Sequence, residues 1–419
     1  MFSLLNIRVG FYLALRQLRG ASKWTTGLIV FVMLLTFLNL VVVTGILVGL
    51  IEGINSSYRT QYTGDVIISP LSTKEYVEDT ANIVAFLKTL PEVSLLTTRY
   101  QTSGTIEANY TTRTNSKEKP NATGAQILGI DPVAEDAFTG LGAKVIEGGA
   151  YLASGDYDQV LIGKYLLAQY AFGEVPGLTP LKNVTPGTTI RVTINGATRE
   201  VVVKGFLNTK IDALAMSVFM PAHQLRTMMG RTDQNVAQIA VRLKEGGDPV
   251  AFKELLLASG LGEKAKVQTF TDSIPSGVED IKKTFAMLGN GFSSIGLVVA
   301  AITIFIVIFI NAITRRKFIG ILKGIGISGE AIEISYIFQS LFYAVIGSSI
   351  GLVVLYGFLV PAVAAHPIDF PFSDGILVAP IDGTLIRVGL LVVTTVIAGY
   401  VPSRMIIRRN TLDSILGRK

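Results

Sequence analysis

Long stretches without any charged residue alternate with charged stretches along this chain. The first uncharged stretch runs from Trp24 to Ile51, and a second runs from Thr284 to Thr314. A helix rises about 1.5 Å per residue, so about 20 apolar residues cross the hydrocarbon layer of a membrane, which is about 30 Å thick. Both stretches therefore predict membrane-spanning helices. The second would be about 46 Å long, with a polar but helix-compatible stalk leading into it.

Two further apolar stretches follow before the end of the chain. The third is uncharged from Ile334 to Ile368, but Pro361 and Pro367 interrupt it, so we expect one span that ends near Val360. The fourth, 385–401, carries Arg387 near its start, where a long side chain can reach the membrane surface. The pattern predicts an α-helical membrane protein with four transmembrane helices.

The block between the first two spans is polar and predicts a mixed α/β domain, inserted between helices 1 and 2. Thr188–Asn195 and Ala197–Phe206 predict a β-hairpin that turns at Asn195-Gly196. A helix is expected through Leu166, Leu167 and Tyr170. Strands are expected at 65–69, 93–109, 125–130, 160–162, 236–243 and 265–270, and helices at 80–90 and 249–258. A β-rich subdomain, about 131–228, is expected between two flanking β/α pieces that pack together.

The basic residues predict the orientation of the chain, because positive charge stays on the cytoplasmic side of a membrane. The segment before the first span, the loop after span two and the tail after span four are basic, whereas the loop between spans three and four carries three Asp and no Lys or Arg. The inserted block holds 23 Lys/Arg and 25 Asp/Glu, so its net charge is 23 − 25 = −2. Since the whole chain carries +6, the excess positive charge lies in the cytoplasmic segments. Both termini are therefore expected inside and the large domain outside.

The segment 1–23 predicts an amphipathic helix on the inner leaflet. Its apolar residues recur at spacings of three and four (Leu4, Ile7, Phe11, Leu15 and Leu18), and Arg8, Arg16, Arg19 and Lys23 lie on a neighbouring face. The simpler interpretation is a cytoplasmic lead-in whose charges only set the orientation. The apolar run that follows is too long for the core of a signal peptide, so we expect a retained span.

The sequence argues against an enzyme. There is no cysteine, so disulfides and thiolate chemistry are excluded. The two histidines, His223 and His366, lie far apart in the sequence, and no hydrolase or metal-ligand spacing is present. Gly163-Lys164 lacks the upstream glycine of a nucleotide-binding loop and is followed by Tyr165. We expect no catalytic, cofactor-binding or metal-binding residues in this chain.

The segment after span two, TRRKFIGILKGIGIS from Thr314 to Ser328, carries the most specific pattern. Lys317, Ile321 and Gly324 share one helical face, and Gly326 can end the helix. Such a short basic helix can dock in the groove of a partner, although an ordinary cytoplasmic loop would also be basic.

This segment resembles the signature of an ABC transporter permease family that includes the macrolide-exporter (MacB-type), lipoprotein-releasing and FtsX-type subunits. The family pattern is approximately E-R-R-x-E-I-G-I-L-R-A-L-G-A-S. Thr314 and Phe318 depart from it, each where the family has Glu. The positions that match the pattern are Arg315, Arg316, Ile319, Gly320, Ile321, Leu322, Lys323, Gly326 and Ser328.

Weaker similarities extend along the whole chain. The tail from Pro402 is similar to the end of the family pattern, with Thr411 in place of its second proline, and 13–19 is similar to its start. The inserted block resembles the MacB-type periplasmic core domain in the order and spacing of short motifs. These motifs are Gly129-Ile130-Asp131-Pro132, Glu147-Gly148, Val160-Leu161-Ile162-Gly163, Pro186-Gly187 and Val203-Lys204-Gly205-Phe206.

The resemblance implies a permease subunit that couples ATP hydrolysis by a separate cytoplasmic ABC ATPase to export or extraction of a lipoprotein, lipid, peptide or drug. It implies the cytoplasmic membrane of a bacterium or archaeon, a second permease chain in a homodimer or heterodimer, ATP and Mg²⁺ bound only by the ATPase, and room for an extracytoplasmic adaptor. The residues it assigns to ATPase coupling are Arg315, Arg316, Lys317, Ile319, Gly320, Leu322, Lys323 and Gly326. The alternative is an FtsX-like signalling subunit that activates an extracellular partner, such as a cell-wall hydrolase, without transport.

Span three also contains Gly347-x-x-x-Gly351, which permits close helix packing, for example at a dimer seam. The simpler interpretation is a pair of glycines that faces lipid. No charged residue lies in the centre of spans one to three, which argues against a pathway for small ions. The predicted organisation is a cytoplasmic helix 1–23, spans 24–51, 284–314, 334–360 and 385–401, an outside domain 52–283, a coupling segment 315–333, an outside loop 361–384 and a cytoplasmic tail 402–419.

Overall fold

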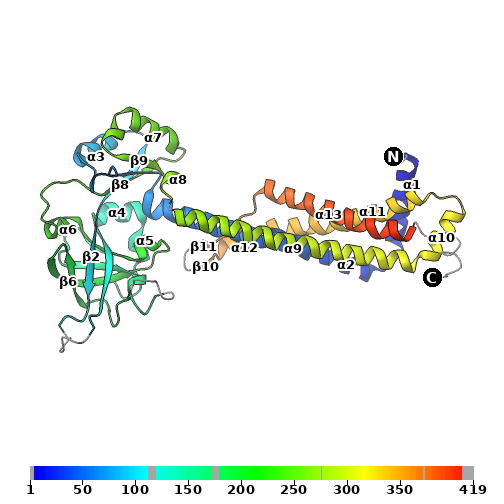
Figure 1. The fold of residues 1–419 in the computed structure, drawn as a ribbon, viewed down its shortest axis with the longest axis horizontal. Helices are drawn as coiled ribbons and strands as arrows, with labels where there is room; N and C mark the ends of the chain where they lie inside the picture. The colour runs from blue at the N-terminus through cyan, green and yellow to red at the C-terminus, as the bar shows by residue number, and fades with distance from the viewer. Residues whose placement is uncertain (1–3, 112–118, 172–178, 275, 371–372, 408–419) are drawn as a thin grey trace. The chain divides into compact units, whose positions relative to one another are not determined.

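The computed structural model describes residues 4–111, 119–171, 179–274, 276–370 and 373–407. The chain divides into two compact units. The helical unit comprises residues 1–51, 280–369 and 374–419, and the α/β unit comprises residues 52–279 and 370–373. Figure 1 shows the ribbon of both units with the element labels used below.

The helical unit consists mainly of long helices, which are apolar enough to avoid water along most of their length. Four helices of the described residues have the length and hydropathy needed to span a membrane. Its elements are α1 (Leu4–Arg19), α2 (Lys23–Tyr58), α9 (Ser276–Thr314), α10 (Arg316–Gly324), α11 (Gly329–Val354), α12 (Val360–Ala365), β10 (Ile368–Phe370), β11 (Ser373–Gly375) and α13 (Ile381–Ile407). Helices α2 and α9 also have residues in the α/β unit.

The third span is longer than the sequence predicted. A π-helical turn, η5 (Leu355–Leu359), joins α11 to α12, and the helix continues to Ala365 instead of ending near Val360. Pro361 follows this π-helical turn closely, and the helix continues through it. The helix therefore continues past the proline at which the sequence pattern suggested an end.

The fourth span is also longer than predicted at both ends. Helix α13 begins at Ile381, and it continues through Pro402 to Ile407. A proline inside a membrane helix is tolerated because neighbouring groups can satisfy the freed backbone carbonyl. The rest of the predicted tail, 408–419, lies outside the described residues.

The α/β unit contains one sheet of nine strands among the described residues, in the order β3-β7-β4-β6-β5-β2-β8-β1-β9. The strands are β1 (Val66–Ser69), β2 (Val93–Glu107), β3 (Ala122–Ile130), β4 (Gln159–Gly163), β5 (Thr189–Ile194), β6 (Ala197–Leu207), β7 (Ser217–Pro221), β8 (Gln238–Leu243) and β9 (Lys266–Thr269). An additional pairing of β3 with β2 closes the first six strands of this order into a ring. Helices α3 (Thr80–Thr89), α4 (Pro132–Thr139), α5 (Asp212–Ala215), α6 (Ala222–Met228), α7 (Pro249–Ala258) and α8 (Phe270–Ser273) accompany the sheet.

The predicted hairpin is present and is the clearest local agreement. Strands β5 and β6 pair antiparallel with Ile194 opposite Ala197. The two turn residues, Asn195 and Gly196, both have positive φ, 48° and 85°, which a two-residue hairpin turn requires.

The division into subdomains differs from the prediction at one strand. The flanking strands β8 and β9 each pair with β1, which lies between them, as the expected packing of the flanking pieces requires. The first half of the long strand β2 pairs with β8, however, while its second half pairs with β3 and β5. The β-rich part therefore begins before residue 131 and shares a strand with the flanking part. The helix predicted through Leu166, Leu167 and Tyr170 is wrong, since only a 3₁₀ turn, η3 (Lys164–Leu166), forms there.

A buried ion pair lies within the apolar core of the α/β unit. The side chains of Arg99 on β2 and Glu135 on α4 are 1% and 0% exposed. Arg99 Nε donates to both carboxylate oxygens at 2.9 and 3.0 Å, and Thr97 Oγ1 donates to one of them at 2.7 Å. Water does not reach the Glu135 carboxylate, but these hydrogen bonds satisfy its oxygens. They therefore offset the free-energy cost of burying the charge.

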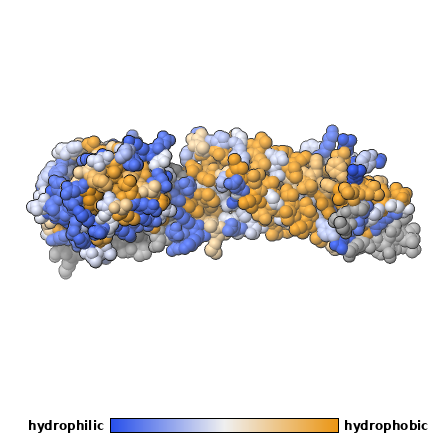
Figure 2. Space-filling view, turned by 90° about the horizontal axis from the view of Figure 1, so that it is seen from above, coloured by the Kyte–Doolittle hydropathy of each residue, from blue (hydrophilic) through white to orange (hydrophobic). Residues whose placement is uncertain are grey.

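The two units expose surfaces of different polarity. In Figure 2 the surface of the helical unit is mostly hydrophobic, with hydrophilic residues gathered where α1 and α10 lie, whereas the α/β unit shows hydrophilic residues around a hydrophobic area. This contrast fits a helical unit that is surrounded by lipid along its middle and an α/β unit that is surrounded by water.

Candidate functional site: the basic end of the helical unit

The candidate site is centred on α10, the short helix between α9 and α11. Helix α9 ends at Thr314, and Arg315 breaks the helical geometry with φ −97° and ψ 16° before α10 begins. At the other end, Ile327 N–H donates to Leu322 O and Gly326 N–H donates to Lys323 O, both at 3.0 Å. This Schellman motif needs a left-handed residue, and Gly326 supplies it with φ +96°.

Helix α10 has one buried face and one exposed face. Ile319, Gly320 and Leu322 are buried against the helical unit. Phe318, Ile321 and Ile325 are 49%, 53% and 71% exposed, and their spacing of three and four places them on one side of the helix. An exposed cluster of three large apolar side chains on a short basic helix is typical of a surface that a partner covers.

The basic residues of this segment occupy three different environments. Lys317 is exposed beside Phe318, whereas Arg315 and Arg316 are half-buried. Arg316 Nε is buried, and no hydrogen-bond acceptor contacts it within the part of the chain that the structure describes. Lys323 Nζ donates to the carbonyl oxygen of Ile407 at the end of α13. Lys323 thus fixes α10 to the last span, while Lys317 remains available on the surface.

Helix α11 begins next to α10 with a serine cap that also contacts α1. Ser328 Oγ accepts from Ala331 N–H at 3.2 Å and donates to Asn6 Oδ1 at 2.9 Å. Asn6 Nδ2 in turn donates to Glu330 Oε2 at 2.9 Å. The first turn of α11 is therefore bonded to the start of α1, which is distant from it in the sequence.

Helix α1 packs on α11 through its small and polar residues. Its buried residues are Gly10, Ala14 and Gln17. A methyl group at Gly10 would lie 2.6 Å from Ile334 Cγ2, and Gln339 Nε2 donates to Gln17 Oε1 at 2.6 Å. Consequently the apolar face of the predicted amphipathic helix stays exposed, with Leu4, Leu5 and Phe11 more than half exposed. That exposure suits a helix whose apolar face enters the membrane interface.

The two glycines of span three make a close contact within the chain. A methyl group at Gly347 would lie 2.5 Å from Met33 Cβ, and one at Gly351 would lie 2.2 Å from Phe37 Cδ1. Met33 and Phe37 belong to α2 and are fully buried. The close approach that the sequence suggested therefore joins α11 to α2 of the same chain.

A second pair of glycines, which the sequence interpretation missed, lies on α2. A methyl group at Gly49 would lie 1.7 Å from the carbonyl oxygen of Ile376, and one at Gly45 would lie 2.8 Å from Leu377 Cδ1. Val378 N–H donates to Gly45 O at 3.2 Å. The signal was present in the sequence as Gly45-x-x-x-Gly49, but the partner segment 376–378 is not helical and gave no pattern of its own.

The structure thus separates the residues that the resemblance assigned to ATPase coupling. Lys317 lies on the exposed face of α10, while Ile319, Gly320 and Leu322 lie on the buried face and Lys323 bonds to α13. Gly326 forms the turn. Phe318 and Ile325 were not among the assigned residues, although their spacing from Ile321 was readable as one face of a helix. Their coupling role stays a prediction.

The α/β unit contains a polar cleft with a volume of about 710 Å³. It is lined by three basic and three acidic side chains, Arg59, Arg242, Lys244, Glu52, Asp65 and Glu245. Arg59 Nε donates to Asp65 at 2.7 Å, and Arg242 Nη2 donates to Thr60 O at 2.7 Å. Burial lowers the pKa of the Arg242 guanidinium, and the nearby Asp65 opposes this shift. Because the basic and acidic side chains are equal in number, the cleft has no evident preference for a positively or a negatively charged ligand. Among the described residues, no three metal-ligating side chains come together.

Comparison with protein families identifies two matching regions. Residues 26–258 match the MacB-like periplasmic core domain, and residues 290–411 match the FtsX-like permease C-terminal region. The probable syringafactin export ATP-binding/permease protein SyfD of Pseudomonas syringae pv. tomato is 24% identical over 265 residues, which cover 61% of this chain and 37% of SyfD. The macrolide export ATP-binding/permease protein MacB of Campylobacter fetus is 22% identical over 44% of this chain and 28% of its own length.

The chain therefore matches only a minor part of the length of these two relatives. Among solved structures, the periplasmic region of MacB from Actinobacillus actinomycetemcomitans is 16% identical, with a TM-score of 0.34, over 55% of this chain and 95% of that structure.

Proposed function

Because the chain belongs to the family of ABC transporter permeases of the MacB and FtsX type, we propose that it couples ATP use by a partner ATPase to export or extraction of a lipophilic or amphiphilic substrate. Membership in this family implies an ATPase partner and a second permease chain.

The observation that carries the proposal is the two-sided character of α10. Its buried face, with Ile319 and Leu322, is packed into the helical unit, and Lys323 ties it to α13. Its exposed face presents Phe318, Ile321 and Ile325 beside Lys317. A helix that is fixed on one side and apolar on the other can transmit the movement of a docked ATPase to the spans.

The continuity of α2 and α9 supports a mechanical route to the α/β unit. Helix α2 covers 36 residues and α9 covers 39, and each has residues in both units. A continuous helix is stiff over this length, because every internal turn is hydrogen-bonded. Closure of two ATPase subunits on α10 would therefore reach the α/β unit through these two helices.

We place the termini and α10 in the cytoplasm and the α/β unit outside, on the distribution of basic residues. ATP and Mg²⁺ would be bound by the partner, because this sequence contains no nucleotide-binding loop. The membrane would be the cytoplasmic membrane of a bacterium or archaeon.

The class of substrate follows from the lack of charge in the spans and from the relatives. No Asp, Glu, Lys or Arg lies in the central part of the first three spans. SyfD is named for syringafactin export and MacB for macrolide export. We propose by analogy that an amphiphilic molecule is acted on at the outer leaflet or above it.

The test is ATP turnover and complex formation of the chain with its cognate ATPase, purified together and reconstituted in lipid nanodiscs. Phe318→Ala with Ile321→Ala should weaken association by about tenfold or more, because apolar anchors dominate such interfaces. Arg315→Glu with Arg316→Glu should lower turnover in the complex that remains.

Phe292 on α9 is a matched control, because it is 49% exposed, as Phe318 is. Phe292→Ala should leave association and turnover unchanged. Normal coupling in both α10 variants would overturn the contact assignment. If ATP turnover activated an extracellular hydrolase and moved no labelled amphiphile, the signalling role would replace the proposed export.

A further inference from the structure

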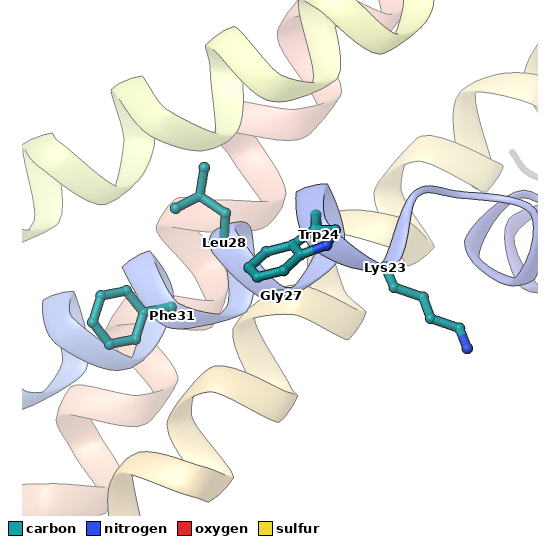
Figure 3. Close-up of a pocket in the computed structure, with 5 residues that line it drawn as sticks. All are labelled: Lys23, Trp24, Gly27, Leu28 and Phe31. Atoms are coloured by element: carbon teal, nitrogen blue, oxygen red, sulfur yellow. The ribbon is translucent and has the colours of Figure 1, made fainter.

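A row of exposed apolar side chains follows the first turns of α2. Trp24, Leu28, Phe31 and Leu35 are 89%, 64%, 52% and 49% exposed. Their spacings of four, three and four place them on one side of the helix. Lys23 lies at the start of this row, and in Figure 3 its amine extends beyond the first turn while Phe31 lies at the other end.

A groove opens in the middle of this row. It has a volume of about 480 Å³ and is lined by Lys23, Trp24, Gly27, Leu28 and Phe31. Gly27 forms its floor, because a methyl group added there would meet no atom within 4 Å. The groove is therefore apolar along its length and basic at one end, and no described residue of the helical unit fills it.

The basic end of this row lies in a segment that has no acidic residue of its own. The segment 1–51 contains Arg8, Arg16, Arg19 and Lys23 and no Asp or Glu. Arg16, Arg19 and Lys23 are exposed at the junction of α1 and α2. None of these three forms an ion pair with a described residue.

We propose that this groove is a binding site for an anionic phospholipid of the leaflet at the basic end of the helical unit. One acyl chain would lie over Gly27 between Trp24 and Phe31, and the phosphate would lie against Lys23. An indole ring at the boundary of the hydrocarbon layer and a basic residue just outside it suit the two parts of such a lipid. The site does not depend on what the transporter exports.

Charge also decides between a lipid and a second copy of the chain as the occupant. A symmetric pair that met at this row would bring two copies of the same basic, carboxylate-free segment together. Like charges repel at such a contact, whereas a phosphate is attracted. The complementary partner of this groove is therefore an acidic lipid headgroup.

Trp24 makes the proposal directly testable, because it is the single tryptophan of the chain. The full-length chain is reconstituted without ATPase in phosphatidylcholine vesicles that contain an equal mole fraction of either brominated phosphatidylglycerol or brominated phosphatidylcholine. Bromine quenches indole fluorescence only at contact. Phosphatidylglycerol should occupy the site about fivefold more than phosphatidylcholine, the preference expected for about one basic residue near the surface.

Two variants, each with a matched control, test the headgroup contact at Lys23 and the acyl-chain contact at Gly27 separately. Lys23→Gln should remove the headgroup preference, whereas Lys283→Gln, an exposed lysine on α9, should retain it. Gly27→Leu should reduce quenching by both lipids. Gly291→Leu on α9 is its control, because Gly291 is also exposed and equally open.

Equal quenching by the two brominated lipids in the unaltered chain would overturn the proposal. So would a preference that survives Lys23→Gln. Because the chain has no cysteine, Trp24→Cys also provides a clean test for the other occupant. Rapid disulfide formation between two Trp24→Cys chains in anionic vesicles would show that a second copy fills the groove and would overturn the lipid site.

Discussion

The helical unit and the α/β unit are held together by different contacts. The α/β unit encloses a large apolar core, with side chains such as Ile127, Val160 and Val218 fully buried, and a buried ion pair. In the helical unit the tightest contacts are glycines against neighbouring segments, as at Gly49 and Gly351. Large apolar side chains are found on its surface as well as in its interior.

The difference follows from the solvent around each unit. Water drives apolar side chains of the α/β unit together, so volume and pattern decide its core. In lipid the hydrophobic effect does not bring helices together, because the acyl chains are as apolar as leucine. Close packing of small residues and internal hydrogen bonds must therefore hold the helices together. Substitutions should therefore destabilise the two units for different physical reasons.

The largest effect is expected at the buried ion pair. Glu135→Ala leaves the Arg99 guanidinium buried without its carboxylate and should destabilise the α/β unit by about 3–5 kcal/mol. Urea unfolding of the full-length chain in detergent, followed by hydrogen exchange, should show loss of protection in β2 and α4. Peptides from α11 and α13 should keep their protection.

A double variant tests whether charge or packing causes that loss. Arg99→Met with Glu135→Leu removes both charges at similar volume and should recover most of the stability, because paired burial of charges brings little net gain. An equal loss of stability in the single and double variants would show that the residues act through shape instead.

A smaller but clear effect is expected at the contact between α2 and segment 376–378. Gly49→Val places a side chain 1.7 Å from a backbone oxygen, which cannot rotate away. The helical unit should lose about 1–3 kcal/mol, the usual cost of overpacking. Thermal unfolding of the purified chain, followed by the fluorescence of Trp24, measures this loss.

Gly291→Val is the control for overpacking in a span, since nothing lies within 4 Å of the added carbon. It should leave the melting temperature almost unchanged. If both variants melted at the same temperature as the unaltered chain, the close contact at Gly49 would have no energetic role.

The smallest loss of stability is expected where a glycine with positive φ is replaced by alanine, and it should be the same in both units. Gly326 and Gly196 have φ of +96° and +85°, and an added methyl group would meet nothing within 4 Å at either position. Alanine should cost about 1–2 kcal/mol at each, because the strain lies in the backbone and does not depend on the solvent. Hydrogen exchange at α10 and at the β5–β6 turn would measure the two losses separately. A neutral Gly326→Ala beside a costly Gly196→Ala would contradict this equality.

Sequence patterns correctly predicted those helices and strands that are determined by residues close together in the sequence. The hairpin at Asn195-Gly196 and the helix at Pro249–Ala258 were correct, because turn residues and apolar spacing act over a few residues. The helix predicted at Leu166 failed, since Leu166 and Leu167 are buried in the core from a 3₁₀ turn and an extended residue. Helices α12 and α13 contain Pro361 and Pro402, so a proline in the sequence did not mark the end of either helix.

At the candidate site the sequence located the segment but not the roles of its residues. The pattern around Arg315 and Gly326 marked α10, and the turn at Gly326 was expected. Which face of α10 is buried depends in part on α13, which is distant in the sequence and accepts a hydrogen bond from Lys323 at Ile407. For that reason Ile319 and Leu322 could not be separated from Phe318 and Ile325 before the structure was known.

By itself the sequence determined that this chain has four apolar segments long enough to span a membrane, a polar α/β insertion and a basic segment between two spans. Those features depend on composition and local spacing, which each segment carries within itself. Only the tertiary structure decided that β2 is shared by both parts of the sheet, that Gly49 contacts Ile376, and that Trp24 and Gly27 remain uncovered. Each of these depends on which distant segment occupies a given space, and no local pattern contains that information.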